Sequence, residues 1–375
     1  MKILVLCYEY PPVGGGGGRV AAQVAAGLVR RGHEVKVHTA GLAHLPAREV
    51  RDGVEILRAP SFRRSEDTCS VPEMALYILT NVLPAGRFAR RWKPDVLHVH
   101  FAVPSGVVGL AVSVATGIPY VLTAHLGDVP GGVPEQTAGL FKLVNPFARF
   151  IWKHAVRVTA VSRHVASLAR AAYGTEAQII LNGVPARPPA PPILQTPRRL
   201  LLVGRLSVQK NPLLAVRALA LLKDLAWELE VIGDGPLAGD LRAETERLGL
   251  ADRVIFQGWM DGAAVAGRMA AADLLLMTSL HEGLPMVAVE ALQCGLAIVG
   301  SDIGGLHDVI EDGRNGFLCP LTPEAFAERL RTLFADAPRL LAARRASLEL
   351  AGNFDLEKSL DAYEKALLEA SRRTS

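Results

Sequence analysis

Two glutamates, Glu282 and Glu290, stand eight positions apart and flank the start of a predicted helix. Pro285 lies between them and suits the first helical position, where its missing N–H is not needed. We expect this helix to run to about Cys294 and to stop at Gly295. Carboxylates before and inside a helix could both accept hydrogen bonds from sugar hydroxyls. Taken alone, the pair also fits ordinary surface positions, so the neighbouring residues decide its meaning.

The start of this predicted helix also offers a place for an anion. The first backbone N–H groups of a helix have no partner within it, and its dipole is positive at that end. These groups would lie just behind Gly283. A phosphate there would have Glu282 beside it and Glu290 about a turn and a half into the helix. This arrangement suits a ligand made of a sugar, a diphosphate and a ribose.

Two cations, Arg205 and Lys210, follow a predicted strand in the second half of the chain. Fixed cations at a strand–helix corner would stabilise a diphosphate leaving group, although ordinary surface charges are the alternative. Asn211 can cap the next helix and Pro212 can be its first residue. The chain has 37 acidic residues but no Asp-x-Asp, the kind of closely spaced pair that usually holds a divalent metal. We therefore expect neither a metal nor another cofactor.

Five consecutive glycines, 14–18, separate the first predicted strand from the first helix. Glycine lets a backbone approach a ligand closely. The stretch Gly16-x-Gly18-x-x-Ala21 loosely fits a dinucleotide fingerprint, but the second strand lacks the acid that would hold a ribose. No Gly-Lys-Ser/Thr follows, which argues against a nucleotide P-loop. The glycines are therefore predicted to form a floor for a diphosphate or an acceptor, with a flexible turn as the alternative.

Histidines follow or occupy two further predicted strands. His125 comes at the end of one strand and could bind a sugar hydroxyl or relay a proton, although a lone histidine is often structural. His98 and His100 lie on one face of another strand and resemble a metal pair. Because no third ligand lies nearby, we favour packing for these two.

Short apolar strands that alternate with helices must position these residues. Such continuous apolar runs predict parallel sheets covered on both faces. In the first half, the predicted strands are 3–7, 35–39, 54–57, 96–99, 120–123, 158–161 and 179–181, and the predicted helices are 19–31, 72–91, 105–116 and 162–172. In the second half, the predicted strands are 200–203, 229–232, 254–257, 274–277 and 297–300, and the predicted helices are 212–225, 236–248, 285–294 and 354–371. Six prolines between 184 and 198 mark a stiff hinge between the halves.

The composition fits two globular domains. The chain has 375 residues, of which 50% are apolar and 21% charged. A net charge of +4 without a long basic tract argues against a nucleic-acid partner. The basic patch Arg87–Lys93, with Phe88 and Trp92, could touch an anionic membrane surface, or it could be a solvated helix end. Four cysteines without disulfide or metal spacing and no expected signal peptide favour a cytoplasmic protein, with peripheral contact to the inner membrane face as an option.

With these residues in view, the chain resembles the retaining, metal-independent glycosyltransferases of the GT-B fold, and specifically glycosyltransferase family 4, the group 1 glycosyl transferases. The motifs that carry the resemblance extend over nearly the whole chain. They are Pro-Pro-x-Gly-Gly at 11–15, Gly-His-Glu-Val at 32–35, Pro-Asp-Val-Leu-His at 94–98, Asn-Gly-Val at 182–184, Gly204-Arg205 with Lys210, Gly-Asp-Gly at 233–235, Glu282 to Glu290, Asp-Ile-Gly-Gly at 302–305 and Asp-Gly-Arg-Asn-Gly at 312–316.

The resemblance implies an α/β fold of two doubly wound Rossmann-like domains that face each other across a cleft. Residues 1–183 would form the acceptor-binding domain, 184–198 the proline-rich hinge and 199–353 the nucleotide-sugar-binding domain. Residues 354–375 would form a helix that crosses back to the first domain. Two positions depart from the pattern: Pro185 follows Asn-Gly-Val where an acid is usual, and Leu126 separates His125 from Gly127.

The resemblance also implies roles for individual residues toward a UDP- or GDP-linked sugar. Arg205 and Lys210 would hold the diphosphate, Glu290 the ribose, and Glu282 would face the sugar. Other donor contacts would come from Gly15, Gly16, Gly283, Leu284, Pro285 and Met286, and His125 would complete the catalytic set. Phe256 and Trp259 would line the base pocket, and Tyr10, Gly127 and Asp128 would contact the acceptor.

The expected activity is transfer of a sugar to a hydroxyl of a sugar- or lipid-linked acceptor, with retention at the anomeric carbon. Synthesis of bacterial surface polysaccharides or glycoconjugates is the expected setting. The alternatives are a sugar-nucleotide epimerase and a catalytically silent protein that binds nucleotide sugars. A nicotinamide-dependent dehydrogenase fits less well, because the second strand lacks the ribose-binding acid.

Overall fold

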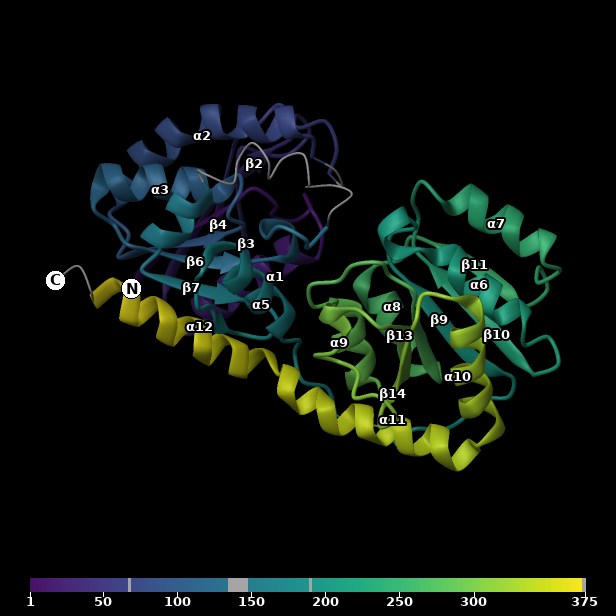
Figure 1. Cartoon of the computed structure of the whole chain (residues 1–375). Coiled ribbons are helices and arrows are strands. Elements are labelled where there is room, and N and C mark those ends of the chain that lie inside the picture. The colour runs from purple at the N-terminus through teal and green to yellow at the C-terminus, as the bar shows by residue number, and fades with distance from the viewer. Residues whose placement is uncertain (67–68, 134–147, 189–190, 373–375) are drawn as a thin grey trace. The chain divides into compact units, whose positions relative to one another are not determined.

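The structure is a computed structural model that describes residues 1–66, 69–133, 148–188 and 191–372. The chain forms two compact units, each with its own sheet and flanking helices (Figure 1). Unit 1 contains residues 1–182 and 357–375, and unit 2 contains residues 183–356.

Unit 1 is built on an eight-stranded sheet in the order β3-β4-β2-β1-β5-β6-β7-β8. Its strands are β1 (Lys2–Cys7), β2 (Glu34–Gly41), β3 (Arg48–Arg51), β4 (Val54–Pro60), β5 (Val96–His100), β6 (Tyr120–Ala124), β7 (Arg157–Ala160) and β8 (Gln178–Ile179). All neighbours pair in parallel except β3, which runs antiparallel to β4 at the edge. The helices are α1 (Gly16–Arg30), α2 (Val71–Trp92), α3 (Ser105–Thr116), α5 (Arg163–Tyr173) and, from the end of the chain, α12 (Leu356–Ser371), with the short η1 (Leu126–Asp128).

Unit 2 is built on a six-stranded parallel sheet in the order β11-β10-β9-β12-β13-β14. Its strands are β9 (Arg198–Val203), β10 (Trp227–Ile232), β11 (Val254–Gly258), β12 (Leu274–Met277), β13 (Ala297–Ser301) and β14 (Gly316–Cys319). Its helices are α6 (Pro212–Ala220), α7 (Ala238–Arg247), α8 (Gly262–Ala270), α9 (Met286–Gln293), α10 (Pro323–Ala335) and α11 (Ala337–Ala351), with η2 (Val208–Lys210), η3 (Gly304–Leu306) and η4 (Gly352–Phe354). The order doubles back at β9, so right-handed crossovers put α6 and α9 on opposite faces.

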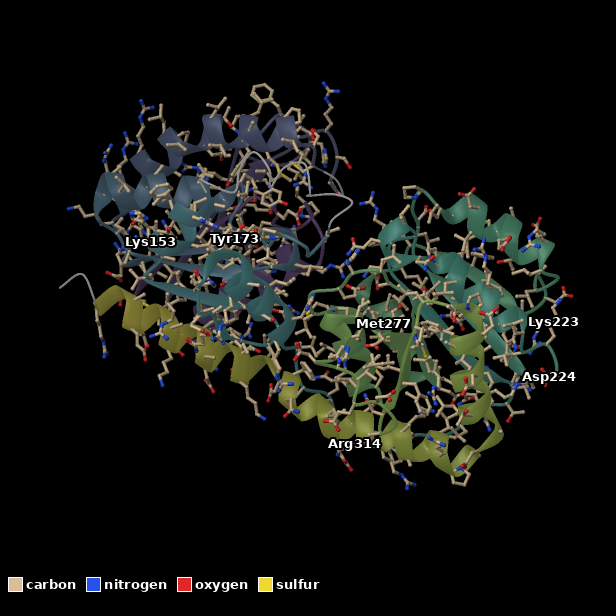
Figure 2. All side chains as sticks on the ribbon, viewed as in Figure 1. Lys153, Tyr173, Lys223, Asp224, Met277 and Arg314 are labelled. Carbon is tan, nitrogen blue, oxygen red and sulfur yellow. The ribbon has the colours of Figure 1, made fainter. Side chains whose placement is uncertain are left out.

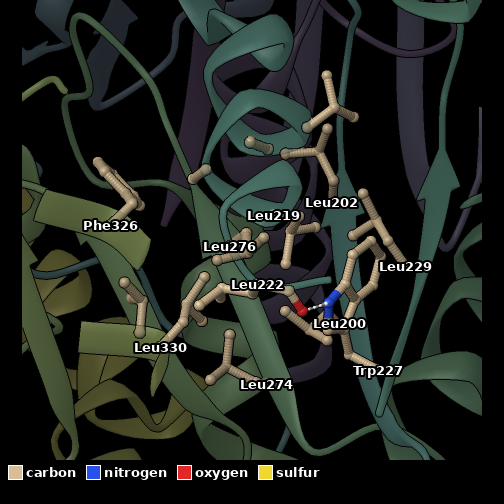
Figure 3. Packing of buried hydrophobic residues seen from close by; sticks show 14 of the residues in the cluster. Leu200, Leu202, Leu219, Leu222, Trp227, Leu229, Leu274, Leu276, Phe326 and Leu330 are labelled. Carbon is tan, nitrogen blue, oxygen red and sulfur yellow. Dashed lines mark hydrogen bonds between the residues drawn. The ribbon is translucent and has the colours of Figure 1, made fainter. Parts of the chain in front are cut away.

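The core of unit 2 explains why these runs form strands. Leucines from β9, β10 and β12 meet the apolar face of α6 and side chains of α10 (Figure 3). Trp227 belongs to this cluster and is 1% exposed, and its indole N–H donates to the carbonyl oxygen of Leu222 at 2.8 Å (Figure 3). The one polar group of this large side chain is therefore satisfied inside the core.

A buried ion pair joins three elements of unit 2. The guanidinium of Arg344 on α11 lies 2.8 Å from a carboxylate oxygen of Asp273, just before β12. The same carboxylate accepts from the backbone N–H groups of Gln195 and Arg199. The described part of the proline-rich segment is thus fixed to unit 2 through its last residues.

The last helix, α12, packs against α1 in unit 1. A Cβ on Gly27 of α1 would lie 2.4 Å from a methyl group of Leu360, so only glycine allows the two helices to approach this closely. At one end of this contact, Glu364 accepts from Arg31 at 2.9 Å and lies 2.8 Å from the His33 ring. α12 is therefore held both by packing and by ion pairs, which include Glu369 with Arg157 as well as Glu364 with Arg31.

Several elements differ from the sequence-based expectations. The edge strand β3 was not expected, because its sequence REVR has no apolar alternation. α8, α10, α11 and β14 were not expected either. α6 was expected to run to 225 but ends at Ala220. α1 begins at Gly16, three residues earlier than expected, because a helix start can include glycines when the following residues pack.

Candidate functional site

The most informative place in unit 2 is the point where its strand order reverses, between β9 and β12. In open parallel sheets, ligands bind outside the carboxyl ends of the strands at this point. The loop after β9 carries Arg205 and Lys210, and the loop after β12 carries Glu282. The sheet topology therefore brings three predicted site residues to one edge.

Lys210 and Glu282 connect these two loops directly. The Lys210 ammonium lies 2.5 Å from Oε1 of Glu282, which also accepts from the Ser279 hydroxyl at 2.7 Å. The Glu282 side chain is 7% exposed and that of Lys210 is 27% exposed. The pair is thus set at the wall of the site, with the cation on its open side.

Backbone contacts strengthen the same connection. The Thr278 hydroxyl donates to the Lys210 carbonyl oxygen, and Leu280 N–H donates to the Gln209 carbonyl oxygen at 2.7 Å. The Gln209 amide in turn donates to the carbonyl oxygen of His281 at 3.0 Å. The two loops therefore behave as one structural element, which fixes the position of the Lys210 ammonium.

A small pocket opens between these loops. It is lined by the end of β9 with Gly204, Arg205 and Leu206, by Lys210 and Pro212, and by residues 276–279 at the end of β12. Arg205 is exposed and reaches this pocket from the strand end. Both predicted diphosphate-binding cations thus line one concave surface.

The glutamate pair flanks the start of α9 as expected, but the helix begins one residue later. Pro285 is the residue before the first helical position and has an extended ψ of 116°, because the helix starts at Met286. Gly295 follows the end of α9 with a left-handed φ of +63°, as the sequence predicted. Glu290 lies half-buried inside the helix.

The segment before α9 has mixed exposure. Leu284 and Pro285 are buried, whereas Gly283 and Met286 are half-buried. The buried pair anchors the turn, so the neighbouring backbone at 283 and 286 is the part that a ligand could reach. Asn211 precedes α6 as predicted, in a left-handed conformation, but its side chain makes no capping hydrogen bond, and Pro212 is the first helical residue.

The aromatic residues predicted for the base pocket lie in different surroundings. Phe256 on β11 is packed against the unit 2 core, and the Arg242 guanidinium lies 4.2 Å from its ring centre. Trp259 is 73% exposed in the turn after β11. The two rings therefore do not form one buried slot, and Phe256 serves the core.

In unit 1, the glycine loop lies at the corresponding reversal point, after β1 and beside β5. Its five glycines have different surroundings. A Cβ on Gly14, Gly17 or Gly18 would lie within 2.7 Å of an existing atom, whereas Gly15 and Gly16 face open space. Three glycines are thus required by packing. The two that were predicted to contact the donor are free to meet a ligand at the start of α1.

His125 lies next to this loop, at the end of β6. Its ring stacks on Phe101 with centres 4.3 Å apart, and its Nε2 lies 3.3 Å from Nδ1 of His100. A Cβ on Gly17 would lie 3.1 Å from the other ring nitrogen, Nδ1. Burial lowers the pKa of His125 to about 3, so the ring is neutral near pH 7. The His125 ring can therefore donate and accept hydrogen bonds but carries no charge near pH 7.

Two of the three predicted acceptor contacts are wrong as side-chain contacts. Asp128 is 3% exposed, and its carboxylate accepts from the backbone N–H groups of His125 and Ala102, each at 2.7 Å. Burial raises the pKa of Asp128 to about 7. Tyr10 is 3% exposed and packs in the core. Gly127 is exposed and remains accessible.

The His98 and His100 rings lie in the core, as the sequence favoured. Both are 0% exposed, and Nε2 of His98 lies 2.8 Å from the Thr123 hydroxyl. Among the residues that the structure describes, no group of three or more histidine, cysteine or carboxylate side chains could hold a metal ion.

Comparisons with known proteins add a family to this geometry. Residues 14–187 match the model of "Glycosyltransferase Family 4", and residues 186–349 match "Glycosyl transferases group 1". The 2-deoxystreptamine glucosyltransferase of Streptomyces kanamyceticus is 30% identical over 92% of this chain and 97% of its own length. The 2-deoxystreptamine N-acetyl-D-glucosaminyltransferase of Streptomyces fradiae is 32% identical over 92% and 89%. The chain belongs to the family 4, group 1 glycosyltransferases.

Solved structures share the fold of this glycosyltransferase. Sucrose-phosphate synthase from Thermosynechococcus elongatus superposes with a TM-score of 0.86 at 20% identity and covers 98% of each chain. Anabaena HepE, solved in complex with UDP-glucose, has a TM-score of 0.77 at 22% identity and covers 98% of this chain and all of its own. The two Rossmann-like units are thus those of the GT-B fold. Within its described ranges, the glycosyltransferase has no helix that is long and apolar enough to cross a membrane.

Sequence reasoning missed two residues that shape the site of this glycosyltransferase, Thr278 and Ser279, and gave a third, Asp128, a different role. Ser279 and Thr278 fix Glu282 and the Lys210 backbone, and Asp128 fixes the turn that carries His125. The sequence did carry one signal for the first two, since hydroxyl side chains directly follow β12 at the reversal point. Asp128 lies close to His125 in the chain, but its burial depends on the distant residue Ala102.

Proposed function

We propose that this glycosyltransferase transfers a sugar from a UDP- or GDP-linked donor to an acceptor hydroxyl, with retention and without a metal ion. The donor diphosphate would bind in unit 2 between Arg205, Lys210 and the start of α9. Glu290 would hold the ribose and Glu282 would accept from the sugar. Support comes from the pocket between the two loops and from HepE, a protein of the same fold that binds UDP-glucose.

The observation that carries the proposal is the contact of Lys210 with Glu282. An ammonium held at the wall of a pocket can stabilise the charge that develops on a departing diphosphate without reorganising. The Glu282 carboxylate holds that ammonium through Oε1, which leaves Oε2 to accept from a sugar hydroxyl. Glu282 can therefore be more than nine-tenths buried, with one oxygen bound to Lys210, and still offer its second oxygen to a ligand.

The proposed reaction forms one bond and breaks one bond at the anomeric carbon. The acceptor oxygen bonds to that carbon on the face from which the diphosphate oxygen leaves, which retains configuration. The departing phosphate oxygen takes the acceptor proton, so the products are a glycoside and a nucleoside diphosphate. His125 and the backbone at Gly15 and Gly16 would contact the transferred sugar from unit 1.

The absence of Asp-x-Asp in the sequence and the presence of two cations at the pocket support a metal-independent reaction. Turnover should persist in excess EDTA. Complete loss with EDTA and recovery with Mg²⁺ or Mn²⁺ would contradict this part of the proposal.

The acceptor is proposed to be a sugar- or lipid-linked hydroxyl of a bacterial glycoconjugate precursor, used in the cytoplasm. The two Streptomyces relatives are named for 2-deoxystreptamine, so an acceptor panel should also include an aminocyclitol. The donor can be found first, by a thermal-shift screen of UDP- and GDP-sugars, since a ligand that prefers the folded state raises the melting temperature.

The central test replaces each cation singly. Lys210→Ala and Arg205→Ala should keep the wild-type melting temperature within a few degrees and lose about 10²–10³-fold in turnover. Lys223→Ala is the matched control, since Lys223 is an exposed lysine of unit 2 that does not line the pocket. Figure 2 labels Lys223 together with Met277, which does line the pocket. Near-wild-type turnover in both pocket variants would refute the diphosphate role.

A further inference from the structure

Helix α2 of unit 1 exposes a stripe of leucines. Leu76, Leu79 and Leu83 are 39%, 74% and 65% exposed, and their spacing of three and four residues puts them on one face. α2 packs on α3 (Figure 1), and its buried residues, among them Tyr77, Asn81 and Ala89, lie on another face, so the leucine face is exposed within the described part of unit 1. Exposed leucines in a row are unusual for a surface that meets only water.

The same face becomes cationic toward the end of the helix. No charged residue occurs from 74 to 86, and Arg87, Arg90 and Arg91 then follow, all exposed. Residues 87 and 90 continue the spacing of the leucine stripe. The face therefore has an apolar half and a basic half in line, which is the pattern of a helix that lies in a membrane interface.

The aromatic residues of the basic patch do not take part in this surface. The Trp92 indole donates to the Glu34 carboxylate at 3.0 Å, and the Lys36 ammonium lies 4.9 Å from the Trp92 ring centre. Phe88 packs beside Trp92. Both rings are half-buried and are held by residues of β2, so the exposed apolar area next to the basic patch comes from other residues. The exposed leucines of α2 form this apolar area.

We propose that α2 docks unit 1 on an anionic lipid bilayer, with its leucines among the acyl chains and its arginines at the headgroups. A second copy of the chain is the weaker occupant, because the basic half would then need a carboxylate-rich surface, which the leucine half does not provide. Anionic lipid complements both halves at once. Each basic residue near such a surface strengthens binding by about fivefold.

The test measures co-sedimentation of the full chain with vesicles. Wild type should bind vesicles of phosphatidylcholine mixed with phosphatidylglycerol, bind pure phosphatidylcholine at least about tenfold more weakly, and release with added salt. The double variant Leu79→Glu/Leu83→Glu should lose binding. Val50→Glu is the control. Val50 lies on the edge strand β3 and is about as exposed as Leu79, and this variant should bind vesicles as wild type does.

Three outcomes would overturn the docking proposal: equal binding to both vesicle types, binding that survives in the double variant, or dimers of wild type in sedimentation that the double variant abolishes. The last outcome would assign the face to a second copy. Because vesicle binding needs neither donor nor acceptor, its failure is separate from a failure of the proposed sugar transfer.

An independent observation concerns the contact between His100 and His125. Both rings are neutral, because burial lowers both pKa values, so one proton must lie between Nδ1 of His100 and Nε2 of His125. The remaining nitrogen of His100, Nε2, has no hydrogen-bond partner in the described part of the chain. The two possible tautomers of this pair therefore differ in which buried atom is left unsatisfied.

A buried N–H without a partner is the rarer and costlier arrangement. If His100 carried its proton on Nε2, that N–H would have no acceptor. If it carries the proton on Nδ1, that N–H donates to His125 and only a lone pair is unsatisfied. His125 must then carry its own proton on Nδ1, the nitrogen beside Gly17.

We infer that His100 is a positioning residue that makes His125 a hydrogen-bond donor toward the glycine loop. His125 would then donate to an oxygen of the transferred sugar and would not act as a general base. This inference rests on the proposed function only for the identity of that oxygen. The tautomer itself is a property of the chain without ligand.

The test reads the tautomer by ¹⁵N NMR of the full chain labelled at histidine, with the His125 signals assigned from His125→Gln. Wild type should show the proton of His125 on Nδ1. His100→Asn retains an amide N–H near the Nδ1 position and should preserve both this pattern and turnover. His100→Leu should change the pattern and lower turnover by about fivefold to tenfold.

His38→Leu is the matched control. His38 is a buried imidazole of the same sheet, but its register partner Leu6 pairs with Val99, so it lies on the face opposite His98 and His100. This variant should leave the His125 pattern unchanged. A wild-type proton on Nε2 of His125, or an unchanged pattern in His100→Leu, would overturn the inference even if sugar transfer is confirmed.

Discussion

The backbone of Gly305 lies directly against the peptide group that follows Glu282. A Cβ at position 305 would lie 1.9 Å from the Glu282 carbonyl oxygen, which no side chain could tolerate. Gly305 belongs to η3, after β13, so a third loop supports the glutamate from behind while Lys210 and Ser279 hold its carboxylate. The position of Glu282 is therefore determined on both its backbone and its side chain.

Gly305→Ala should displace the Glu282 loop and lower turnover more than it lowers stability. The added methyl group cannot be placed without moving the Glu282 peptide, and small displacements at a reacting centre cost about 10²-fold. Turnover and the melting temperature should be measured together. Gly267→Ala in α8 is the control, since a Cβ there meets nothing within 4 Å, and it should be neutral in both. Equal activity of the two variants would contradict the prediction.

A double-mutant cycle should show that Lys210 and Glu282 act as a unit. Lys210→Met and Glu282→Gln should each lower turnover strongly. The turnover of the double variant should be only slightly below that of the less active single variant. The physical reason is that each substitution already removes the held ammonium from its position. Additive losses on the logarithm of turnover would show instead that the two residues contribute independently.

The strands that carry the site were predictable because their signal is local. Runs such as Leu274–Met277 are apolar, short and followed by polar residues, which is sufficient to place a buried parallel strand and its carboxyl end. The cations and Glu282 could then be assigned to one sheet edge from their position in the chain. The glycine loop was equally predictable as a strand–helix connection.

The burial of individual side chains was not predictable, because distant residues determine it. Tyr10 and Asp128 follow strand ends and carry polar groups, which is the pattern of a ligand contact. In the structure, Tyr10 is buried in the core, and the Asp128 carboxylate accepts a hydrogen bond from the backbone N–H of Ala102, 26 positions away. The exposure of the leucine face of α2 was not predictable either. Its pattern of leucines fits a core helix, and only the structure shows that this face is exposed.

Arg344→Met should destabilise unit 2 strongly. The Arg344 and Asp273 side chains are 3% and 0% exposed, so removing the cation leaves a buried carboxylate without its charge partner. Such a change costs about 3–5 kcal/mol in the free energy of unfolding. Urea denaturation checks the loss, and Arg345→Met, at the exposed neighbouring position, should change the midpoint little. Adding Asp273→Asn to Arg344→Met should recover part of the stability.

The docking of α12 should depend on pH through Glu364. The hydrogen bond from His33, and then that from Arg31, lowers the pKa of Glu364 below its usual value of 4.5. A carboxylate with a lowered folded pKa stabilises the fold fully above its unfolded pKa, and this contribution is lost as the pH falls through the folded pKa. Glu364→Gln should therefore cost about 1 kcal/mol at neutral pH, and the difference from wild type should shrink below about pH 4.5.

Urea denaturation of wild type and Glu364→Gln at neutral pH and at several acidic pH values measures this difference directly. Glu357→Gln is the matched control, because Glu357 lies on the same helix and also contacts Arg31, but its side chain is 61% exposed. Water screens that exposed pair, so its removal should matter little at any pH. A Glu364→Gln deficit that stays constant into acid would show that the lost interaction is packing and not the charge on Glu364.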